Sequence, residues 1–155
     1  MSNQLAAATA IDTSVIVPGL LFWHEKHAVA SAALIELLES GNPVVLPLHS
    51  LVEAYAVMTR LPPPHRLSAK DALDLLNGSF RQRSNLVGLE GDEGWELLQS
   101  LRDRDLVGGT SYDSLIFASA RKGGARRLLT FNGSHFERIA GEEIEIVVPA
   151  TAPRG

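Results

Sequence analysis

Three acidic residues stand at positions where a carboxylate could do chemistry. Asp12 lies inside AIDTSVIV, a stretch that is otherwise apolar and β-branched. Glu53 lies in PLHSLVEAYAVMTR, and Asp113 lies in GGTSYDSLIFASA. A charge buried in an apolar element must be paired, hydrogen-bonded or bound to a metal. Asp12 is therefore the first candidate for a functional residue.

The apolar pattern predicts the elements that would position these acids. It predicts strands over Thr9–Val17, Val44–Leu46, Asn85–Leu89, Arg127–Phe131 and Ile144–Val148. It predicts helices over Glu25–Glu39, Ser50–Arg60, Ser68–Phe80, Glu93–Arg104 and Ser111–Lys122, with a short helical turn near Ser134–Ile139. Strands separated by helices indicate a mostly parallel sheet covered on both faces. We expect one α/β domain over residues 1–149 and a flexible tail over residues 150–155.

The three acids fall where such a sheet binds ligands. Open α/β sheets bind outside the carboxyl ends of their strands, so we expect Asp12, Glu53 and Asp113 to converge there. Two charges about 4 Å apart repel by roughly 4 kcal/mol at an effective dielectric near 20, which protons or a divalent cation must relieve. Oxygen ligands favour Mg²⁺ or Mn²⁺ over zinc. Such a cation, which keeps waters and accepts phosphate oxygens, supports phosphodiester hydrolysis.

Two of the acids also have a purely structural interpretation. Ser50 and Glu53 match a capping box, in which Glu53 would bond back to the start of its helix. Asp113 follows Thr110 by three residues, and the helix dipole favours an acid in a first turn. Asp12, inside a predicted strand, has no helix to cap, so the functional interpretation is strongest for this residue.

The same segments, in this order, resemble the PIN-domain ribonucleases, in particular the VapC toxins of toxin–antitoxin pairs. The matching segments are IDTSVIV, PLHSLVEAYAVMTR, GGTSYDSLIFASA and LLTFNGSHFERI. The resemblance implies a three-layer α/β/α PIN-like domain in which Asp12 and Asp113 ligate Mg²⁺ or Mn²⁺. Glu53 would complete the acidic pocket, directly or through water. Thr13 or Ser14 would help to hold Asp12 and its waters.

One position departs from that family. The family often carries another acid just after the strand that here ends in LLT, whereas this chain has Asn132. Asparagine supplies no charge, so a second metal site would be weak, and Asn132-Gly133 can also be a simple turn. Thr130 and His135, on either side of Asn132, are further candidates near substrate or ligands. Arg60 could neutralise RNA near the acids or form an ordinary ion pair.

The resemblance implies a metal-dependent endoribonuclease, the toxin of a type II toxin–antitoxin pair. Its expected partners are an RNA substrate, a cognate antitoxin and a second copy of the chain. One alternative is an aspartate-based phosphotransferase, although Asp12 lacks the second aspartate two residues on that one such group needs. Another is a degenerate PIN module that binds RNA or protein without cleavage, which Asn132 supports.

Composition limits the remaining choices. The 155 residues carry a net charge of −4, whereas a purely electrostatic nucleic-acid binder would be basic, so any RNA contact must come from a local patch. The chain has no cysteine, which excludes disulfides and thiolate metal sites. We find no signal peptide in MSNQLAAATA and no stretch that could span a membrane. We therefore expect a cytoplasmic protein.

Overall fold

The computed structural model describes residues 7–150, in which strands and helices alternate as the sequence predicts. The strands are β1 (Ala8–Ile11), β2 (Val44–Pro47), β3 (Asn85–Val87), β4 (Ala125–Leu129) and β5 (Glu145–Val147). The helices are α1 (Thr13–Leu20), α2 (His27–Glu39), α3 (Leu48–Arg60), α4 (Ala69–Phe80), α5 (Gly91–Asp103), α6 (Thr110–Lys122) and α7 (Gly133–Glu137). Only residue 150 of the predicted tail is described, so the tail itself lies outside the described residues.

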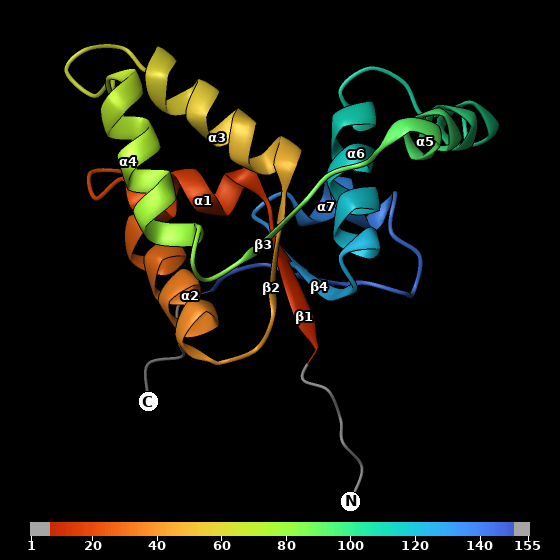
Figure 1. The fold of residues 1–155 in the computed structure, drawn as a ribbon, viewed down its shortest axis with the longest axis horizontal. Helices are drawn as coiled ribbons and strands as arrows, with labels where there is room; N and C mark the ends of the chain where they lie inside the picture. Colours follow the sequence, from red (N-terminus) through yellow and green to blue (C-terminus); the bar gives the residue numbers. More distant parts are fainter. Residues whose placement is uncertain (1–6, 151–155) are drawn as a thin grey trace, which may run out of the picture.

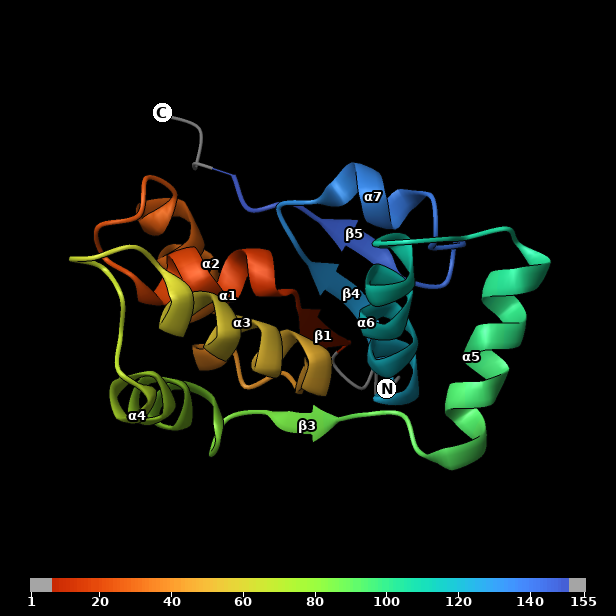
Figure 2. The same cartoon turned by 90° about the horizontal axis from the view of Figure 1, so that it is seen from above.

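The five strands form one parallel sheet in the order β3-β2-β1-β4-β5. Helices α1 to α4 lie on one side of it, and α5 to α7 lie on the other (Figures 1 and 2). This is the predicted three-layer α/β/α arrangement. Strand β1 is central, so the residue that follows it reaches the middle of the sheet's carboxyl edge. That residue is Asp12.

Two cores fill the spaces between the layers because neighbouring strand residues point to opposite faces. Ile11 and Leu46 join the core beneath α1 to α4. Ala10, Val45 and Leu128 join the core beneath α6 and α7. Every residue of β1 and β2 is buried, as expected for strands covered on both faces.

The predicted strand over Thr9–Val17 is wrong in its second half. Strand β1 ends at Ile11, Asp12 is the extended residue before the helix, and α1 begins at Thr13. Val15 and Ile16 are fully buried within α1. Packing of α1 against the sheet and α2 outweighs the modest helix propensity of β-branched residues.

The start of α4 has a side-chain cap, whereas the cap predicted for α3 is wrong. The Ser68 side chain accepts a hydrogen bond from the Asp71 N–H at 3.0 Å and caps α4. The Ser50–Glu53 capping box is wrong, because α3 begins earlier, after Pro47. Ser50 is buried inside the helix, and its hydroxyl has no partner within residues 7–150. Glu53 is thereby free for another role.

No helix within residues 7–150 combines the length and the apolar character needed to cross a membrane.

Candidate active site

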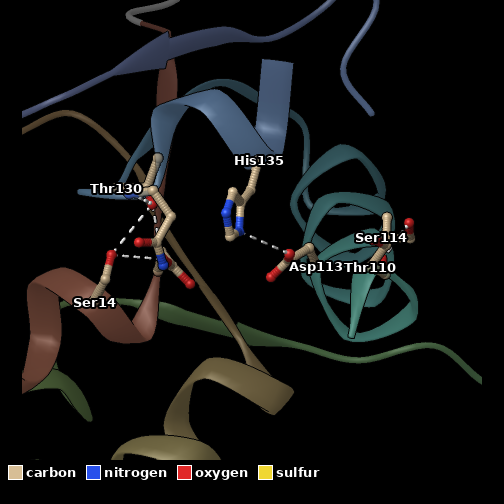
Figure 3. Close-up of polar contacts among 8 residues, drawn as sticks. Ser14, Thr110, Asp113, Ser114, Thr130 and His135 are labelled. Atoms are coloured by element: carbon tan, nitrogen blue, oxygen red, sulfur yellow. Dashed lines mark hydrogen bonds and ion pairs between the residues drawn. The ribbon is translucent and has the colours of Figure 1, made fainter. Parts of the chain in front are cut away.

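Asp12 is held at the carboxyl end of β1 by two hydroxyls. Its side chain is buried, and its Oδ2 accepts hydrogen bonds from Ser14 Oγ at 2.6 Å and from Thr130 Oγ1 at 2.8 Å. Figure 3 shows Ser14 and Thr130 facing one another. Both of these bonds reach the same carboxylate oxygen. Within residues 7–150 no hydrogen bond reaches the Oδ1 atom, which is thus left for a ligand.

The two hydroxyls are themselves fixed by the backbone that follows β4. Ser14 Oγ accepts from the Phe131 N–H, and Thr130 Oγ1 accepts from the Asn132 N–H, both at 2.9 Å. Ser14 comes from α1, whereas Thr130 directly follows β4. The Asp12 carboxylate is therefore oriented by two neighbouring chain segments.

Glu53 approaches Asp12 from α3 through Thr13. The hydroxyl of Thr13 lies 3.1 Å from the Ser50 carbonyl oxygen and 3.3 Å from Glu53 Oε2. His49, one turn before Glu53, places Nε2 at 3.3 Å from the same Oε2. Thr13 thus contacts Glu53, whereas Ser14 holds Asp12.

Asp113 enters from the first turn of α6, on the other side of the sheet from α3. His135 of α7 faces it, with Nδ1 at 3.8 Å from Asp113 Oδ2 (Figure 3). Burial raises the pKa of the Asp113 carboxyl, and the charge of Asp12, with a smaller effect from Glu53, raises it further. His135 and His49 oppose part of this rise in pKa. The three acids are therefore electrostatically coupled.

A cavity of about 330 Å³ joins these side chains. Its wall includes all three acids together with Thr13, Ser14 and Asn132. Lys26 is the one lysine or arginine among the described residues that line it. The Lys26 ammonium lies 4.8 Å from the centre of the Phe131 ring, a cation–π contact. The described lining of the cavity thus combines three carboxylates with the ammonium group of Lys26.

The structure brings together most of the predicted site residues. Thr130 stands behind Asp12, and His135 stands beside Asp113. Arg60 is the exception, because it is exposed at the end of α3 and does not line the cavity. Sequence reasoning missed His49 and Lys26. The spacing of His49 four residues before Glu53 was a usable signal for the first, since such residues share a helix face.

The donor atoms suit a hard divalent cation that retains water. Within residues 7–150, no three His, Cys, Asp or Glu side chains form a ready-made metal cluster. Mg²⁺ does not need one, because it usually keeps several waters and binds one or two carboxylates plus substrate phosphates. The free Oδ1 of Asp12 and the coupled carboxyl of Asp113 supply such oxygens. The residues fit Mg²⁺ or Mn²⁺.

The sequence profile of the PIN domain matches residues 9–142. The chain belongs to the PIN domain family. This PIN domain is 39% identical over 119 residues to Ribonuclease VapC40 of Mycobacterium tuberculosis, covering 77% of this chain and 83% of the relative. It is 33% identical over 111 residues to Ribonuclease VapC27 of the same species, covering 72% and 75%. The predicted VapC-type membership is confirmed.

Solved structures share the fold of this PIN domain. VapC20 of Mycobacterium tuberculosis, described as a sarcin–ricin loop cleaving toxin, superimposes with a TM-score of 0.64 at 19% identity, covering 86% of this chain and 97% of that one. VapBC2 from Rickettsia felis, bound to a promoter DNA fragment, gives 0.61 at 18% identity, with 91% and 98% covered. These matches confirm the α/β/α architecture. Membership also favours a nuclease over the aspartate-based phosphotransferase.

Proposed function

We propose that this PIN domain is the toxin of a type II toxin–antitoxin pair and cleaves RNA internally with Mg²⁺ or Mn²⁺. The observation that carries the proposal is the electrostatic coupling of Asp12, Glu53 and Asp113 in one cavity. The charges of Asp12 and Glu53 raise the pKa of Asp113, and the same negative field favours a divalent cation at Asp113. The sequence identity of 39% and 33% to proteins named as ribonucleases supports RNA as the substrate.

The acids of the cavity and their neighbours have defined tasks. Asp12 and Asp113 would hold the cation, and Glu53 would hold it directly or through water. When bound, the cation lowers the pKa of a water molecule and stabilises negative charge on the scissile phosphate. Ser14 and Thr130 orient Asp12, whereas Thr13 orients Glu53. His135 faces Asp113 and limits the repulsion among the acids.

RNA needs a positive contact to approach an acidic cavity in a chain of net charge −4. Lys26 is placed to give one, because it lies on the cavity wall and is exposed. Its cation–π contact with Phe131 restricts the side chain near the acids. We assign Lys26 to a phosphate next to the cleaved bond.

The proposed partners are a cognate antitoxin and a second copy of the chain. Structural neighbours include FitAB bound to a DNA fragment and VapBC-1 from Haemophilus influenzae, with TM-scores of 0.59 and 0.62. Their shared architecture supports the antitoxin assignment. Co-expression with the antitoxin would suppress growth arrest caused by this chain.

Cleavage of purified tRNA and ribosomal RNA tests the proposal. Wild type cuts in Mg²⁺ or Mn²⁺, stops in EDTA and recovers when the metal is returned. Asp113→Asn cuts at least about 100-fold more slowly, the scale on which loss of one preorganised charge-stabilising group acts. Asp92→Asn, an exposed acid of α5, is the matched control and keeps wild-type activity. Equal activity in EDTA, or in Asp113→Asn, contradicts the metal assignment.

One observation favours a second candidate, a PIN module that binds RNA without cutting it. Asn132 stands on the cavity wall where the resembling family often has an acid. This candidate predicts metal and RNA binding with every tested RNA left intact. The cleavage assay separates the two functions directly.

A further inference from the structure

An exposed tyrosine beside the acidic cavity has no part in the function described so far. Tyr112 directly precedes Asp113 on α6, and 61% of its surface is exposed. Its ring is stacked on His49, with ring centres 5.3 Å apart and an angle of 7° between the planes. These values fall in the offset-stacked range for aromatic pairs. The exposed ring therefore has a fixed neighbour on one side.

The stacked pair is tied to the acids at both ends. Tyr112 is adjacent in sequence to Asp113, while His49 Nε2 contacts Glu53 Oε2 at 3.3 Å. The pair thus bridges the starts of α3 and α6, the two helices that carry Glu53 and Asp113. Within residues 7–150, a second aromatic stack, Trp23 on His65 with ring centres 3.9 Å apart, makes no hydrogen bond or ion pair with any of the three acids. Proximity to the acids distinguishes the Tyr112 stack.

We propose that Tyr112, backed by His49, is a stacking platform for an unpaired base next to the scissile phosphate. Proteins that bind single-stranded RNA commonly stack its bases on aromatic side chains. The platform rests on the proposed function, since it requires RNA at the acidic cavity. It directs the substrate class toward single-stranded segments and loops, because a paired base cannot stack on a side chain without leaving its helix.

Steady-state kinetics on one RNA oligonucleotide test the platform. The cleavage site is first mapped with wild type on tRNA and ribosomal RNA, and a single-stranded oligonucleotide with that site is then used. Loss of base stacking on an aromatic ring costs about 1–3 kcal/mol, so Tyr112→Ala and Tyr112→Leu raise KM by about 5- to 150-fold. Tyr112→Phe keeps the ring and keeps KM within about twofold, as does Trp95→Ala, which removes a 69% exposed aromatic from α5.

Oligonucleotides with a single abasic position locate the platform. Wild type loses affinity when the base at one position beside the cut is removed, whereas Tyr112→Ala is insensitive to the same removal. Such non-additivity is the signature of a direct contact. Wild-type KM in Tyr112→Leu, additive losses at every position, or a KM change that follows a change of oligomeric mass by light scattering would overturn the platform. Failure of wild type to cut any RNA would instead overturn the proposed function.

Discussion

At the scale of single residues, the site is a balance between three acids and the groups that restrain them. Each acid has its own partner: Ser14 and Thr130 hold Asp12, Thr13 and His49 hold Glu53, and His135 faces Asp113. Burial, and then the charge of Asp12, raises the pKa of Asp113. Bringing the acids together therefore disfavours the ionised form of Asp113.

Asp113→Asn is expected to stabilise the metal-free protein at neutral pH. An acid whose pKa is higher in the folded state than its ordinary value of 3.8 binds protons more tightly when folded. The ionised wild type thus loses stability as pH rises from about 3.9 through the folded pKa, and Asn escapes this loss. Urea unfolding in EDTA between pH 4 and 8 measures it.

The advantage of Asp113→Asn should grow with pH across that window and then level off. Added Mg²⁺ should reverse the order, since a ligand that binds only the folded wild type stabilises it. A variant less stable than wild type in EDTA at pH 7, with no dependence on pH, contradicts the repulsion.

Thr130→Val tests the orientation of Asp12. The change keeps the shape of the buried side chain but removes the hydroxyl that donates to Asp12 Oδ2 and accepts from the Asn132 N–H. We expect a loss of about 1–3 kcal/mol in unfolding free energy because buried polar groups lose a partner. Metal affinity should fall by about 10- to 100-fold, as for other supports behind metal ligands.

Thr9→Val is the matched control for Thr130→Val. Thr9 is also a buried threonine, on β1, and within residues 7–150 its hydroxyl makes no recorded side-chain hydrogen bond. Its replacement should leave metal affinity unchanged. Equal effects of the two substitutions on metal affinity would argue against a specific role for Thr130.

The sequence could predict the acids but not all of their neighbours. Asp12, Glu53 and Asp113 are predictable because they follow strands or open helices, and the topology of a parallel sheet brings those positions together. Lys26 reaches the cavity by packing on Phe131, a contact between segments far apart in the chain. The Ser50–Glu53 spacing matches a capping box, but spacing alone does not say where a helix starts, and α3 starts before Ser50.

At the scale of elements, the site depends on how strands end and helices begin. The sequence predicted the order of the strands and of every helix except α1, whose first half it assigned to the strand that holds Asp12. Asp12 occupies the N-cap position of α1, but its side chain makes no capping hydrogen bond, and the run around it is apolar and β-branched. Packing of α1 into the core favours the helix over a longer strand. The function of Asp12 depends on this turn, because it directs the carboxylate out of the sheet.

The far end of α6 fixes the helix that carries Asp113. A Cβ at Gly123, the residue that ends α6, would lie 2.6 Å from Val45 Cγ1 and 3.1 Å from Val87 Cγ2. Valine side chains in a sheet have little freedom to move. We therefore expect Gly123→Ala to destabilise the protein by about 1–3 kcal/mol, the usual cost of overpacking.

Gly78→Ala provides the comparison for Gly123→Ala. Gly78 lies inside α4 with nothing near its virtual Cβ, so alanine should stabilise the protein by about 0.5–1 kcal/mol through helix propensity. Thermal unfolding of the two variants measures the difference. A neutral Gly123→Ala would mean that the end of α6 can shift away from β2 and β3, and α6 would then not be fixed by that contact.

At the scale of the whole molecule, an acidic chain has to bind an acidic polymer. The net charge is −4, and the cavity floor is formed by carboxylates. Long-range attraction therefore cannot supply most of the affinity for RNA. Binding must depend on the metal, on few phosphate contacts and on stacking. Such binding has a shallow salt dependence, which distinguishes it from that of a basic RNA-binding protein.

Lys26→Gln tests this balance because Lys26 is the cation on the cavity wall. Each phosphate contact to single-stranded RNA contributes a slope of about −0.7 in log affinity against log salt. Wild type should show a slope of only about −1 to −2, and Lys26→Gln should remove roughly one contact from it. Lys70→Gln changes the net charge equally at an 81% exposed side chain on α4, and it should leave the slope unchanged. Fluorescence anisotropy with a labelled RNA measures the slopes between about 50 and 300 mM KCl. Equal slopes for both variants would mean that net charge, rather than a phosphate contact at Lys26, governs how this domain binds RNA.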